Sequence, residues 1–313
     1  MTRVILHRVL IAIPALLVMS MLTFALVSLV PGDAAVAILG PEATAEQVRQ
    51  LREQLLLDHS LPVQYWNWLT TLGKGSLGTS VMNGEPVTQI LNERLPVTLA
   101  LVVGTILVSA VIGVSLGAFS ALRGGFAARV VDILSFLGSA LPTFWIALLL
   151  VVVFAVKLRA LPATGYTPLG VSVSGWAVSL ILPICALAVQ GVTGKAVQAR
   201  DSVKDVLARD FVRVQVANGF SRRSIVMKHV LRGAAPAITT IIGLVFVGSL
   251  SGTVVIEVVF ALPGIGQTIV NATVNHDIPV IQGAVLYFTA IVLIVNLITD
   301  VLYVWVDPRV RVG

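Results

Sequence analysis

The stretch KAVQARDSVKDVLARDFVRVQVANGFSRRSIVMKHVLR, residues 195–232, decides how this chain is organised. It carries nine Lys or Arg residues and three Asp residues, and long charge-free apolar runs adjoin it on both sides. A basic loop between two apolar runs is typical of the cytoplasmic side of a membrane protein. Helical periodicity extends to about Asp210, and the next block ends at Gly219, as a helix C-cap would. With a second helical block over residues 222–231, the pattern predicts a short surface helix that two flanking segments present to a partner.

The composition indicates an integral membrane protein. The 313-residue chain is 57% hydrophobic and only 12% charged, whereas a soluble domain has about 25% charged residues. Its cations gather in loops beside apolar runs, which argues against binding of nucleic acid. The single cysteine, Cys185, cannot form an intrachain disulfide. Because it lies within an apolar run, we expect it to be a small buried hydrophobic residue.

Six charge-free runs are long enough to cross a bilayer, which takes about 20 residues. They are residues 9–32, 95–122, 133–156, 160–194, 233–256 and 278–299. The fourth run opens with a turn-rich loop, so its helix is expected over residues 174–191. A seventh run, 258–276, contains Pro263 and Gly264 and a polar cluster, and is predicted to be a re-entrant or interfacial segment. The first run lacks a following cleavage site, so it is interpreted as a retained span rather than a signal peptide.

The distribution of basic residues predicts the orientation of the chain. With six spans, both termini lie on the same side of the membrane. Fifteen Lys and Arg residues fall on that side and six on the other. The positive-inside rule therefore places both termini in the cytoplasm. A seventh span over residues 258–276 would put Arg309 and Arg311 outside, which fits the rule less well.

The longest external segment, residues 33–94, is predicted to contain two helices. Thr44 and Gln47 have the spacing of a capping box that opens the first helix. The apolar face of that helix would consist of Val48, Leu51, Leu55 and Leu56. The second helix is expected over residues 62–72, and its aromatic residues suit the membrane interface, contact with an external partner being the alternative. These aromatic residues are Tyr65, Trp66 and Trp68.

Two glycine patterns need to be interpreted. Residues 73–78, GKGSLG, match G-x-G-x-x-G, but the βαβ unit that a dinucleotide site requires is not predicted around them. The sequence contains no G-x4-G-K-[ST], so this chain is not expected to hydrolyse ATP with a P-loop. Gly113 and Gly117 form a small-x-x-x-small face in the second span. We expect this face to pack within the chain rather than to mediate dimerisation.

Few ionisable residues fall near the membrane interior, where a charge costs about 2.5–3.5 kcal/mol on insertion scales. Asp132 and Asp300 lie at run ends and are expected to pair with Arg129 or Arg309. Glu257 begins the fifth external loop and could either line a translocation path or form a structural hydrogen bond. The histidines are scattered, which indicates no metal site; they are His7, His59, His229 and His276.

The central stretch resembles the cytoplasmic signature loop of permease subunits of ATP-binding-cassette (ABC) importers, EAA-x3-G-x9-I-x-L-P. Gly219 matches the glycine and Leu231 the leucine, whereas residues 213–215 replace the EAA triplet and Arg232 replaces the final proline. The longer string FVRVQVANGFSRRSIVMKHVLRGAAPAI, residues 211–238, is similar to the dipeptide/oligopeptide branch of that family. That branch carries an (F/Y)VR…A-x-G-x-S-x-R…HxLR pattern, so the departures from the general motif mark the branch.

The resemblance covers essentially the whole chain. The other matching blocks are VPGD (30–33), LPVQY (61–65) with WL (68–69), ERLPVT (93–98), LPTFW (141–145), LPATG (161–165), VFALPGIG (259–266), DIPV (277–280) with QG (282–283), and DPR (307–309). They follow one another in the order that the family has. The first span and its long external segment are similar to the first, B-type, subunit of the two dissimilar permeases that such systems use.

The resemblance implies an all-α integral membrane protein with six transmembrane helices, the type I ABC importer permease fold, and a cytoplasmic coupling helix. Residues 1–313 would form one permease domain. Its parts would be an N-terminal span (1–32), an external helical segment (33–94), a five-span core (95–306) with a coupling loop (195–232), and a cytoplasmic tail (307–313). The implied ATPase-coupling residues are Arg213, Gln215, Ala217, Asn218, Gly219, Phe220, Ser221, Arg222 and Arg223. The candidates for the translocation path are Glu257, Pro263 and Gly264.

By the same resemblance, the chain would import dipeptides and oligopeptides by alternating access, in a bacterial or archaeal cell membrane. Its partners would be a second homologous permease, two ATP-binding subunits, an external substrate-binding protein and membrane lipid. ATP and Mg²⁺ would bind to the partner subunits, so this chain would carry no cofactor, metal or catalytic residue. Closure of the ATPases would move the coupling helix as a rigid body. The alternative for the central stretch is a solvated basic loop that only sets topology.

Other solutes and other classes of protein remain as alternatives. Nickel chelates, opines and glutathione-like compounds are solutes of close relatives of the resembled branch. A secondary transporter would need inverted repeats and ionisable groups at the membrane midplane. A channel would need a filter-like motif, and a membrane enzyme a catalytic cluster. We identify none of these features in the sequence.

Overall fold

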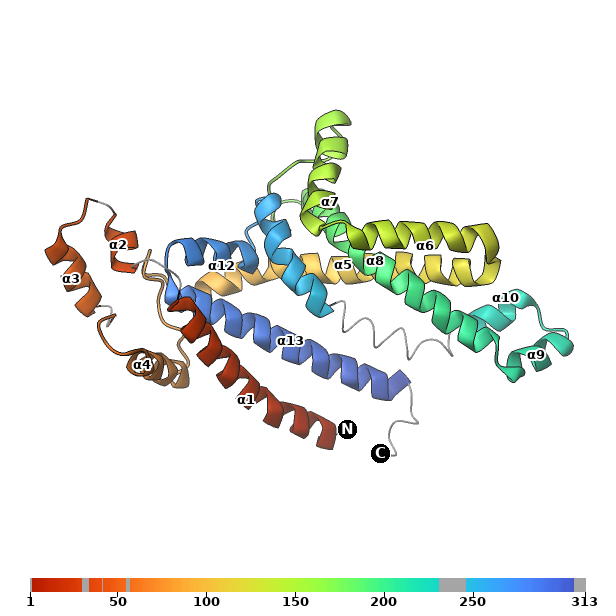
Figure 1. Cartoon of the computed structure of the whole chain (residues 1–313), viewed down its shortest axis with the longest axis horizontal. Helices are drawn as coiled ribbons and strands as arrows, with labels where there is room; N and C mark the ends of the chain where they lie inside the picture. The colour runs from red at the N-terminus through yellow and green to blue at the C-terminus, as the bar shows by residue number, and fades with distance from the viewer. Residues whose placement is uncertain (1, 30–33, 41, 55–56, 231–245, 307–313) are drawn as a thin grey trace. The chain divides into compact units, whose positions relative to one another are not determined.

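The computed structural model describes residues 2–29, 34–40, 42–54, 57–230 and 246–306. These residues are mostly helical, and among them the only β-pairing is an isolated bridge between Thr79 and Pro86. The all-α fold class is therefore confirmed (Figure 1). The chain divides into two compact units, one of Met1–Thr98 with Pro263–Ile294 and the other of Leu99–Leu262 with Val295–Gly313.

The first unit contains the N-terminal helix and the predicted external helices. Its elements are α1 (Thr2–Val27), α2 (Ala34–Leu39), α3 (Ala45–Gln54), α4 (Leu61–Gly73), the start of α5 (Val87–Arg123), α12 (Ile265–Val274) and the first part of α13 (Ile278–Val306). The capping box is confirmed, because Thr44 N–H donates to Gln47 Oε1 (2.9 Å) and Gln47 N–H to Thr44 Oγ1 (3.3 Å). The second predicted helix is also confirmed, as α4. Leu55, Leu56 and the VPGD block at 30–33 lie outside the described residues.

The core of the first unit brings distant parts of the sequence together. It consists of Leu77, Val87, Leu91, Ile265, Ala272, Val280, Ile281 and Ala284. Helix α5 begins at Val87, well before the predicted residue 95, because Val87 and Leu91 lie one turn apart and are both fully buried. The hydroxyl of Thr98 accepts a hydrogen bond from Ile265 N–H (2.9 Å) at the start of α12. Helix α12 spans only ten residues, consistent with the predicted re-entrant or interfacial segment.

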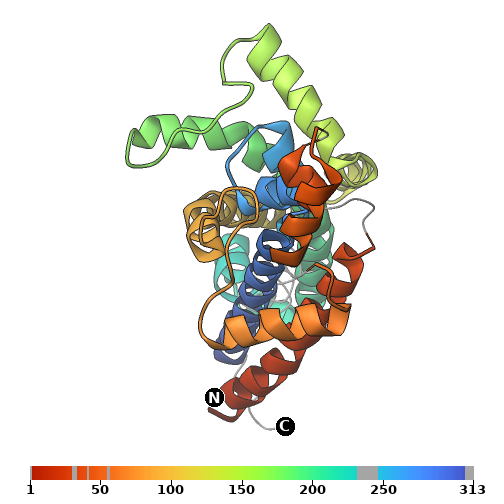
Figure 2. The same ribbon diagram turned by 90° about the vertical axis from the view of Figure 1, so that its left-hand side faces the viewer.

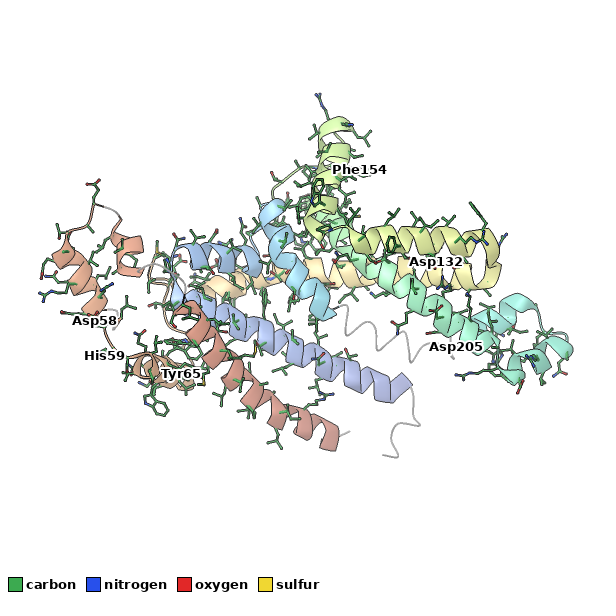
Figure 3. All side chains as sticks on the ribbon, in the orientation of Figure 1. Asp58, His59, Tyr65, Asp132, Phe154 and Asp205 are labelled. Carbon is green, nitrogen blue, oxygen red and sulfur yellow. The ribbon has the colours of Figure 1, made fainter. Side chains whose placement is uncertain are left out.

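Tyr65 joins α4 to α1 within the first unit. Its ring stacks on Trp68 (5.9 Å between centroids) and meets Phe24 edge-on (5.6 Å), and its hydroxyl lies 2.9 Å from that of Ser20. Figure 3 shows Tyr65 on the side of α4 that faces α1. Trp66, in contrast, is 63% exposed. The predicted interfacial role of these aromatic residues stays a prediction.

The second unit is built around α5, α6 (Gly125–Ala140) and α8 (Val173–Leu207), which pack closely together. Its elements are the remainder of α5, α6 (Gly125–Ala140), α7 (Thr143–Leu150), η1 (Val151–Lys157), α8 (Val173–Leu207), α9 (Asp210–Ala217), α10 (Arg222–Ile225), η2 (Val226–Val230), the helix Phe246–Val259 and the end of α13. A Cβ at Gly113 would lie 2.8 Å from Cβ of Lys195, and one at Gly117 would lie 2.8 Å from Cβ of Ala199. The small-residue face on α5 therefore packs within the chain, against α8, as predicted.

The third predicted run is not one straight helix. It forms two helices, Ala128–Ala140 and Thr143–Lys157, which meet at an angle of 103°. Leu141, with φ −86° and ψ 129°, is extended because the ring of Pro142 disfavours a helical conformation in the preceding residue. Figure 2 shows α7 turning away from α6 at this break.

The fourth run extends much further than predicted. Instead of ending near residue 191, α8 continues without interruption to Leu207 and is 35 residues long. Two side chains on it also differ from expectation. Lys195, counted as part of the basic loop, is only 2% exposed and its Nζ donates to Ser109 Oγ (3.1 Å). Cys185, predicted to be buried, is exposed; the apolar run buries only one side of the helix.

Asp132 also differs from the prediction, because it pairs with Arg200 of α8 rather than with Arg129. Figure 3 shows Asp132 on α6, where that helix runs alongside α8. Which charges pair depends on which helices lie side by side in space, and sequence spacing does not reveal this. The side chain of Asp300 and residues Arg309 and Arg311 lie outside the described part of the chain, as does the DPR block at 307–309.

Within the described ranges, four helices are long and apolar enough to cross a membrane: Leu10–Val27, Val87–Arg123, Val173–Leu207 and Ile278–Thr299. The bent pair around Pro142 adds a fifth if it is counted as one span. The fifth predicted run is described only in part, as the shorter apolar helix Phe246–Val259, since residues 231–245 lie outside the description. The chain is a multi-pass membrane protein, and the count of six spans stays a prediction.

Candidate functional site

The predicted surface helix exists as α9, immediately after the end of α8. Only Ala208 and Arg209 separate the two helices. Arg209 is extended, with φ −70° and ψ 146°, so the chain changes direction there and starts a new helix. Asp210 occupies the first turn of α9, where a carboxylate interacts favourably with the helix dipole.

The end of α9 is a Schellman motif. Asn218 is the C-cap, and Gly219 adopts φ +80°, a conformation that glycine reaches without strain. Phe220 N–H donates to Gln215 O (3.2 Å) and Gly219 N–H to Val216 O (3.0 Å), which is the bond pattern that defines the motif. The prediction that Gly219 ends a helix is therefore confirmed. The turn fixes where Phe220 leaves the helix.

One side of α9 is anchored to the rest of the second unit. Val212, the buried residue of α9, belongs to a cluster with Val203 and Val206 of α8, Ile225 of α10 and Val230 of η2. Ala118 and Ala121 of α5 pack against this cluster. The short helix is thus packed through Val212 against α8, α10 and η2. These contacts hold α9 in a fixed position within the second unit, as a rigid docking element would require.

Large apolar groups are exposed along α9 and directly after it. The exposed fractions are 40% for Phe211, 59% for Val214, 62% for Val216 and 56% for Phe220. Val214 lies on the side of α9 opposite Val212, whereas Val216 is one turn from Val212, so the exposed groups are distributed around the free end of the helix. Together with Phe220 they are candidates for contact with another protein. The basic composition of the same stretch did not suggest these exposed groups. Their signal in the sequence is the number of valines among the polar residues of 212–216.

The predicted coupling residues occupy different places around these exposed groups. The Arg213 side chain is 79% exposed and lies 3.6 Å from the carboxylate of Asp210. Gln215 is half-buried, and its Oε1 accepts no hydrogen bond from the described residues. Ala217 ends the helix, and Ser221 Oγ accepts from Ser224 N–H (3.3 Å), which caps α10. Arg222 and Arg223 begin α10, and their side chains lie outside the description; so do Leu231 and Arg232.

The three predicted path residues are packed into the fold. Glu257 lies in the last turns of the helix Phe246–Val259 with a fully buried side chain, and its backbone carbonyl accepts from Leu262 N–H (2.8 Å). Pro263 and Gly264 form the turn that begins α12, and the carbonyl of Gly264 accepts from the Thr268 hydroxyl (2.9 Å). Their role in translocation stays a prediction.

The second unit contains a hollow that sequence reasoning missed. It has a volume of about 270 Å³ and lies beside the break at Pro142. Small and polar residues form most of its wall, which consists of Thr143, Leu187, Gln190, Gly191, Gly248, Ser249 and Gly252. Gln190 Nε2 donates to the carbonyl of Leu141, which the break leaves without its helical partner (3.4 Å). An amide within the apolar fourth run was the available signal.

The described residues offer no group of three or more His, Cys, Asp or Glu side chains that could hold a metal ion. The G-x-G-x-x-G match lies at the end of α4, where Gly75 (φ +83°) and Gly78 (φ +87°) form turns. Within the described part of the chain no strand precedes it, so the dinucleotide interpretation fails here too.

Comparison with known families decides what kind of protein this is. Residues 111–312 match the family described as "Binding-protein-dependent transport system inner membrane component", and residues 1–102 match the N-terminal region of such membrane components. The chain belongs to this family. It is a permease subunit of a transport system, and the resemblance seen in the sequence is confirmed.

The relatives of this permease match it from end to end. The probable peptide ABC transporter permease protein y4tP of Sinorhizobium fredii is 38% identical over 98% of both chains. A putative peptide transport system permease protein of Brucella abortus is 38% identical over 99% of both chains. The glutathione transport system permease protein GsiC of Salmonella choleraesuis is 36% identical over 99% of both.

A solved structure supports the fold of the permease. The MetNI methionine ABC transporter, in inward-facing conformations, contains a chain that matches 70% of this permease with a TM-score of 0.57. The match covers 97% of that chain at 16% identity. The permease therefore has the fold of an ABC importer permease, which agrees with the fold class expected from the sequence.

Proposed function

We propose that this permease is the B-type membrane subunit of an ABC importer that moves dipeptides and oligopeptides into the cytoplasm. The observation that carries the proposal is α9: a short helix anchored by Val212, closed by Gly219 and bearing exposed apolar residues along and directly after it. The solute class follows from relatives named for peptides and for glutathione. Glutathione is itself built from three amino acids, so these names share one solute chemistry.

The proposed partners follow from what this chain presents. The exposed face of α9 would dock into a cleft on one of two ATP-binding subunits, with Phe220 as the apolar anchor and Arg213 meeting acidic groups at the rim. A second homologous permease would complete the translocation path. An external binding protein would deliver the peptide, and ATP and Mg²⁺ would bind to the ATPase subunits alone.

The proposed mechanism is alternating access. Closure of the ATPases on ATP would displace α9. The buried cluster of Val203, Val206 and Val212 would transmit this displacement to α8 as a rigid-body movement. The spans would then switch between inward-facing and outward-facing states. In this proposal both termini and α9 lie in the cytoplasm, as the distribution of basic residues predicts, and residues 1–313 act as one permease domain.

The test uses the complete transporter reconstituted in proteoliposomes, with uptake of radiolabelled trialanine and ATP hydrolysis measured in parallel. Val216→Ser and Phe220→Ser remove exposed apolar side chains at the end of α9 and directly after it. We expect trialanine uptake to fall at least tenfold and less ATPase to co-purify. The matched control is Val173→Ser, at the other end of α8, where the side chain is 69% exposed; its uptake should equal that of the wild type.

A second variant separates the conformation of the turn from its charge. Gly219→Asn keeps a residue that tolerates positive φ, whereas Gly219→Asp adds a negative charge beside the docking face. We expect Gly219→Asp to insert normally and to uncouple ATP hydrolysis from uptake, and Gly219→Asn to remain largely active. Wild-type uptake in both Phe220→Ser and Gly219→Asp would refute docking through α9. Failure of the wild-type complex to import trialanine, with normal docking, would refute only the solute class.

A further inference from the structure

The second unit exposes apolar side chains along α5 and α6. On α5 the outward-facing residues are Val111 (67% exposed), Ile112 (45%), Leu116 (37%) and Phe119 (50%). On α6 they are Ile133 (59%), Leu134 (58%), Phe136 (74%) and Leu137 (52%). Such large apolar groups on the outside of a membrane helix are matched to lipid. We take these residues to mark the part of α5 and α6 that crosses the hydrocarbon region.

Close contacts fix which part of α8 lies at that level. Gly113, next to Ile112, faces Val192 and Lys195, and Gly117, next to Leu116, faces Ala196 and Ala199. From α6, Gly138, next to Leu137, faces Thr193. Residues 192–199 of α8 are therefore at the same depth as the apolar outer faces of both neighbouring helices.

At this depth α8 exposes a different chemistry. Its outward-facing residues are Gln190, Gly194 and Gln198, spaced i, i+4 and i+8 along one face. The buried residues on the side towards α5 and α6 include Thr193, Lys195, Ala196 and Ala199. A Cβ at Gly194 would meet no atom of the described residues within 4 Å, apart from its own helix. Gln190, Gly194 and Gln198 are exposed, so within the described part of the chain the polar face of α8 is open, whereas the faces of α5 and α6 at the same level are apolar.

Contact with lipid would be energetically unfavourable for this polar face. Moving an amide away from water without a hydrogen-bonding partner costs about 2–7 kcal/mol, depending on the reference state. Gln190 and Gln198 lie two turns apart on one face of α8, and each would incur that cost if it faced hydrocarbon. Polar groups inside a membrane accordingly face a protein interior or a water-filled cavity.

The hollow beside Pro142 continues the polar face. Gln190 lines both, and the other residues that line the hollow include Thr143, Gly191, Gly248 and Ser249. Ser249 is only 8% exposed, so it is part of the inner wall rather than of an outer surface. The polar face therefore ends in a space that can hold part of a solute.

We propose that the face formed by Gln190, Gly194 and Gln198, together with the hollow at Thr143 and Ser249, lines the solute path and binds the backbone amides of a peptide. This inference rests on the proposed function and specifies where the solute is held. Primary amides and hydroxyls both donate and accept hydrogen bonds, so they pair with a peptide backbone whatever its side chains. Gly194 leaves space for side chains of different size.

The dimensions fit a short peptide. Gln190 and Gln198 are eight residues apart, which is about 12 Å along the helix axis. Three extended residues span about 10 Å. Neutral hydrogen bonds along such a wall hold a solute weakly, which permits its release, whereas an ion pair at one point would retain it.

The test measures access of water and of peptide to this face in the reconstituted complex. Cys185 is replaced by alanine, since its thiol is exposed, and single cysteines are placed at 194 and 198. The matched controls are cysteines at Val111 and Leu116, which are also exposed but lie on the apolar face. We expect a positively charged methanethiosulfonate to label 194 and 198 at least tenfold faster than 111 and 116. Excess trialanine should slow the labelling at 194 and 198 only.

Two results would overturn the inference. One is labelling of 194 and 198 by a lipid-soluble maleimide but not by the charged reagent, which would place the face in lipid. The other is a disulfide cross-link to the second permease with no effect of trialanine, which would make the face a subunit contact. Trialanine uptake by the wild type is measured first, so failure of the proposed solute class is recognised before the labelling is interpreted.

Substitutions give an independent measure. Gln190→Leu and Gln198→Leu should each lower the initial rate of trialanine uptake at least tenfold while the amount of assembled complex in the membrane stays the same. Leu116→Gln is the reciprocal control, since it places an amide on the lipid face and should reduce assembly. Wild-type uptake by the double variant Gln190→Leu, Gln198→Leu would contradict the proposed path.

Discussion

Replacing Gly117 with alanine tests the closest helix contact in the second unit. A Cβ at this position would lie 2.8 Å from Cβ of Ala199 and 2.9 Å from the backbone nitrogen of Arg200, and closer still to the carbonyl oxygen of Ala196. Two of these three atoms belong to the backbone of α8. They cannot move aside by a side-chain rotation, so the helices themselves must separate.

The size of the effect follows from these distances. Optimal carbon–carbon separations are about 3.5–4.0 Å, so α5 and α8 would have to move apart by roughly 0.8 Å at this point. Overpacking of this kind costs about 1–3 kcal/mol, and the higher figure applies because the backbone must yield. Alanine in place of glycine returns about 1 kcal/mol of helix propensity. We therefore expect Gly117→Ala to lower the free energy of unfolding by about 2 kcal/mol.

Two other glycines supply matched controls. At Gly104 the new methyl group would meet only the flexible end of Ile184, whose Cγ1 would be 3.1 Å away, and a rotamer change costs about 0.5–1.5 kcal/mol. Gly104→Ala should therefore be nearly neutral. At Gly194 no atom of the described residues outside its own helix lies within 4 Å of the new Cβ, so Gly194→Ala should be neutral or slightly stabilising.

The measurement is denaturant-induced unfolding of the detergent-solubilised complex for all three variants. The expected order of stability is Gly194→Ala, then Gly104→Ala, then Gly117→Ala. A Gly117→Ala variant as stable as Gly194→Ala would show that α5 and α8 do not approach as closely as described.

Two further predictions concern buried polar groups. Lys195 is buried with Ser109 as its hydrogen-bonding partner, so Lys195→Met should be at least as stable as the wild type, whereas Lys195→Ala should lose about 2 kcal/mol or more relative to Met through the cavity it leaves; the same unfolding assay would contradict this if Met were the less stable variant. Asp277 accepts hydrogen bonds from the Ser80 hydroxyl and from Val81 N–H (3.3 Å), so Asp277→Asn should cost about 2 kcal/mol and Ser80→Ala less. Protease protection of the loop around Ser80 reports this effect directly, and equal protection in wild type and Asp277→Asn would rule it out.

Local sequence rules were reliable where the decisive contacts are themselves local. Thr44 and Gln47 make the reciprocal bonds of the predicted capping box. Gly219 takes the positive φ that a helix C-cap requires. Gly113 and Gly117, four residues apart, present one face to a neighbouring helix, as their spacing indicated. In each case the residue pattern that predicts the contact spans only a few positions, so it can be recognised in the sequence.

The features that sequence reasoning missed depend on segments that are distant in the chain. Hydropathy ended the fourth span near residue 191, but charged residues do not break a helix, and α8 continues because Ala196, Ala199 and Val203 remain buried on one side. The bend at Leu141 was hidden inside a uniformly apolar run. The pairing of Asp132 with Arg200 required knowledge that α6 lies beside α8.

The continuity of α8 would connect the proposed docking surface to the proposed solute path. With 35 residues the helix is about 52 Å long. Its last turns hold α9 through Val203 and Val206, and its middle exposes Gln190 and Gln198 on the polar face. The proline inside α8 is Pro183, which precedes this whole segment, so the helix has no proline at which it would kink between Gln190 and Leu207. Gln198 and Val206 are about 12 Å apart along the axis, so a displacement of α9 would move the polar face directly, without a separate relay.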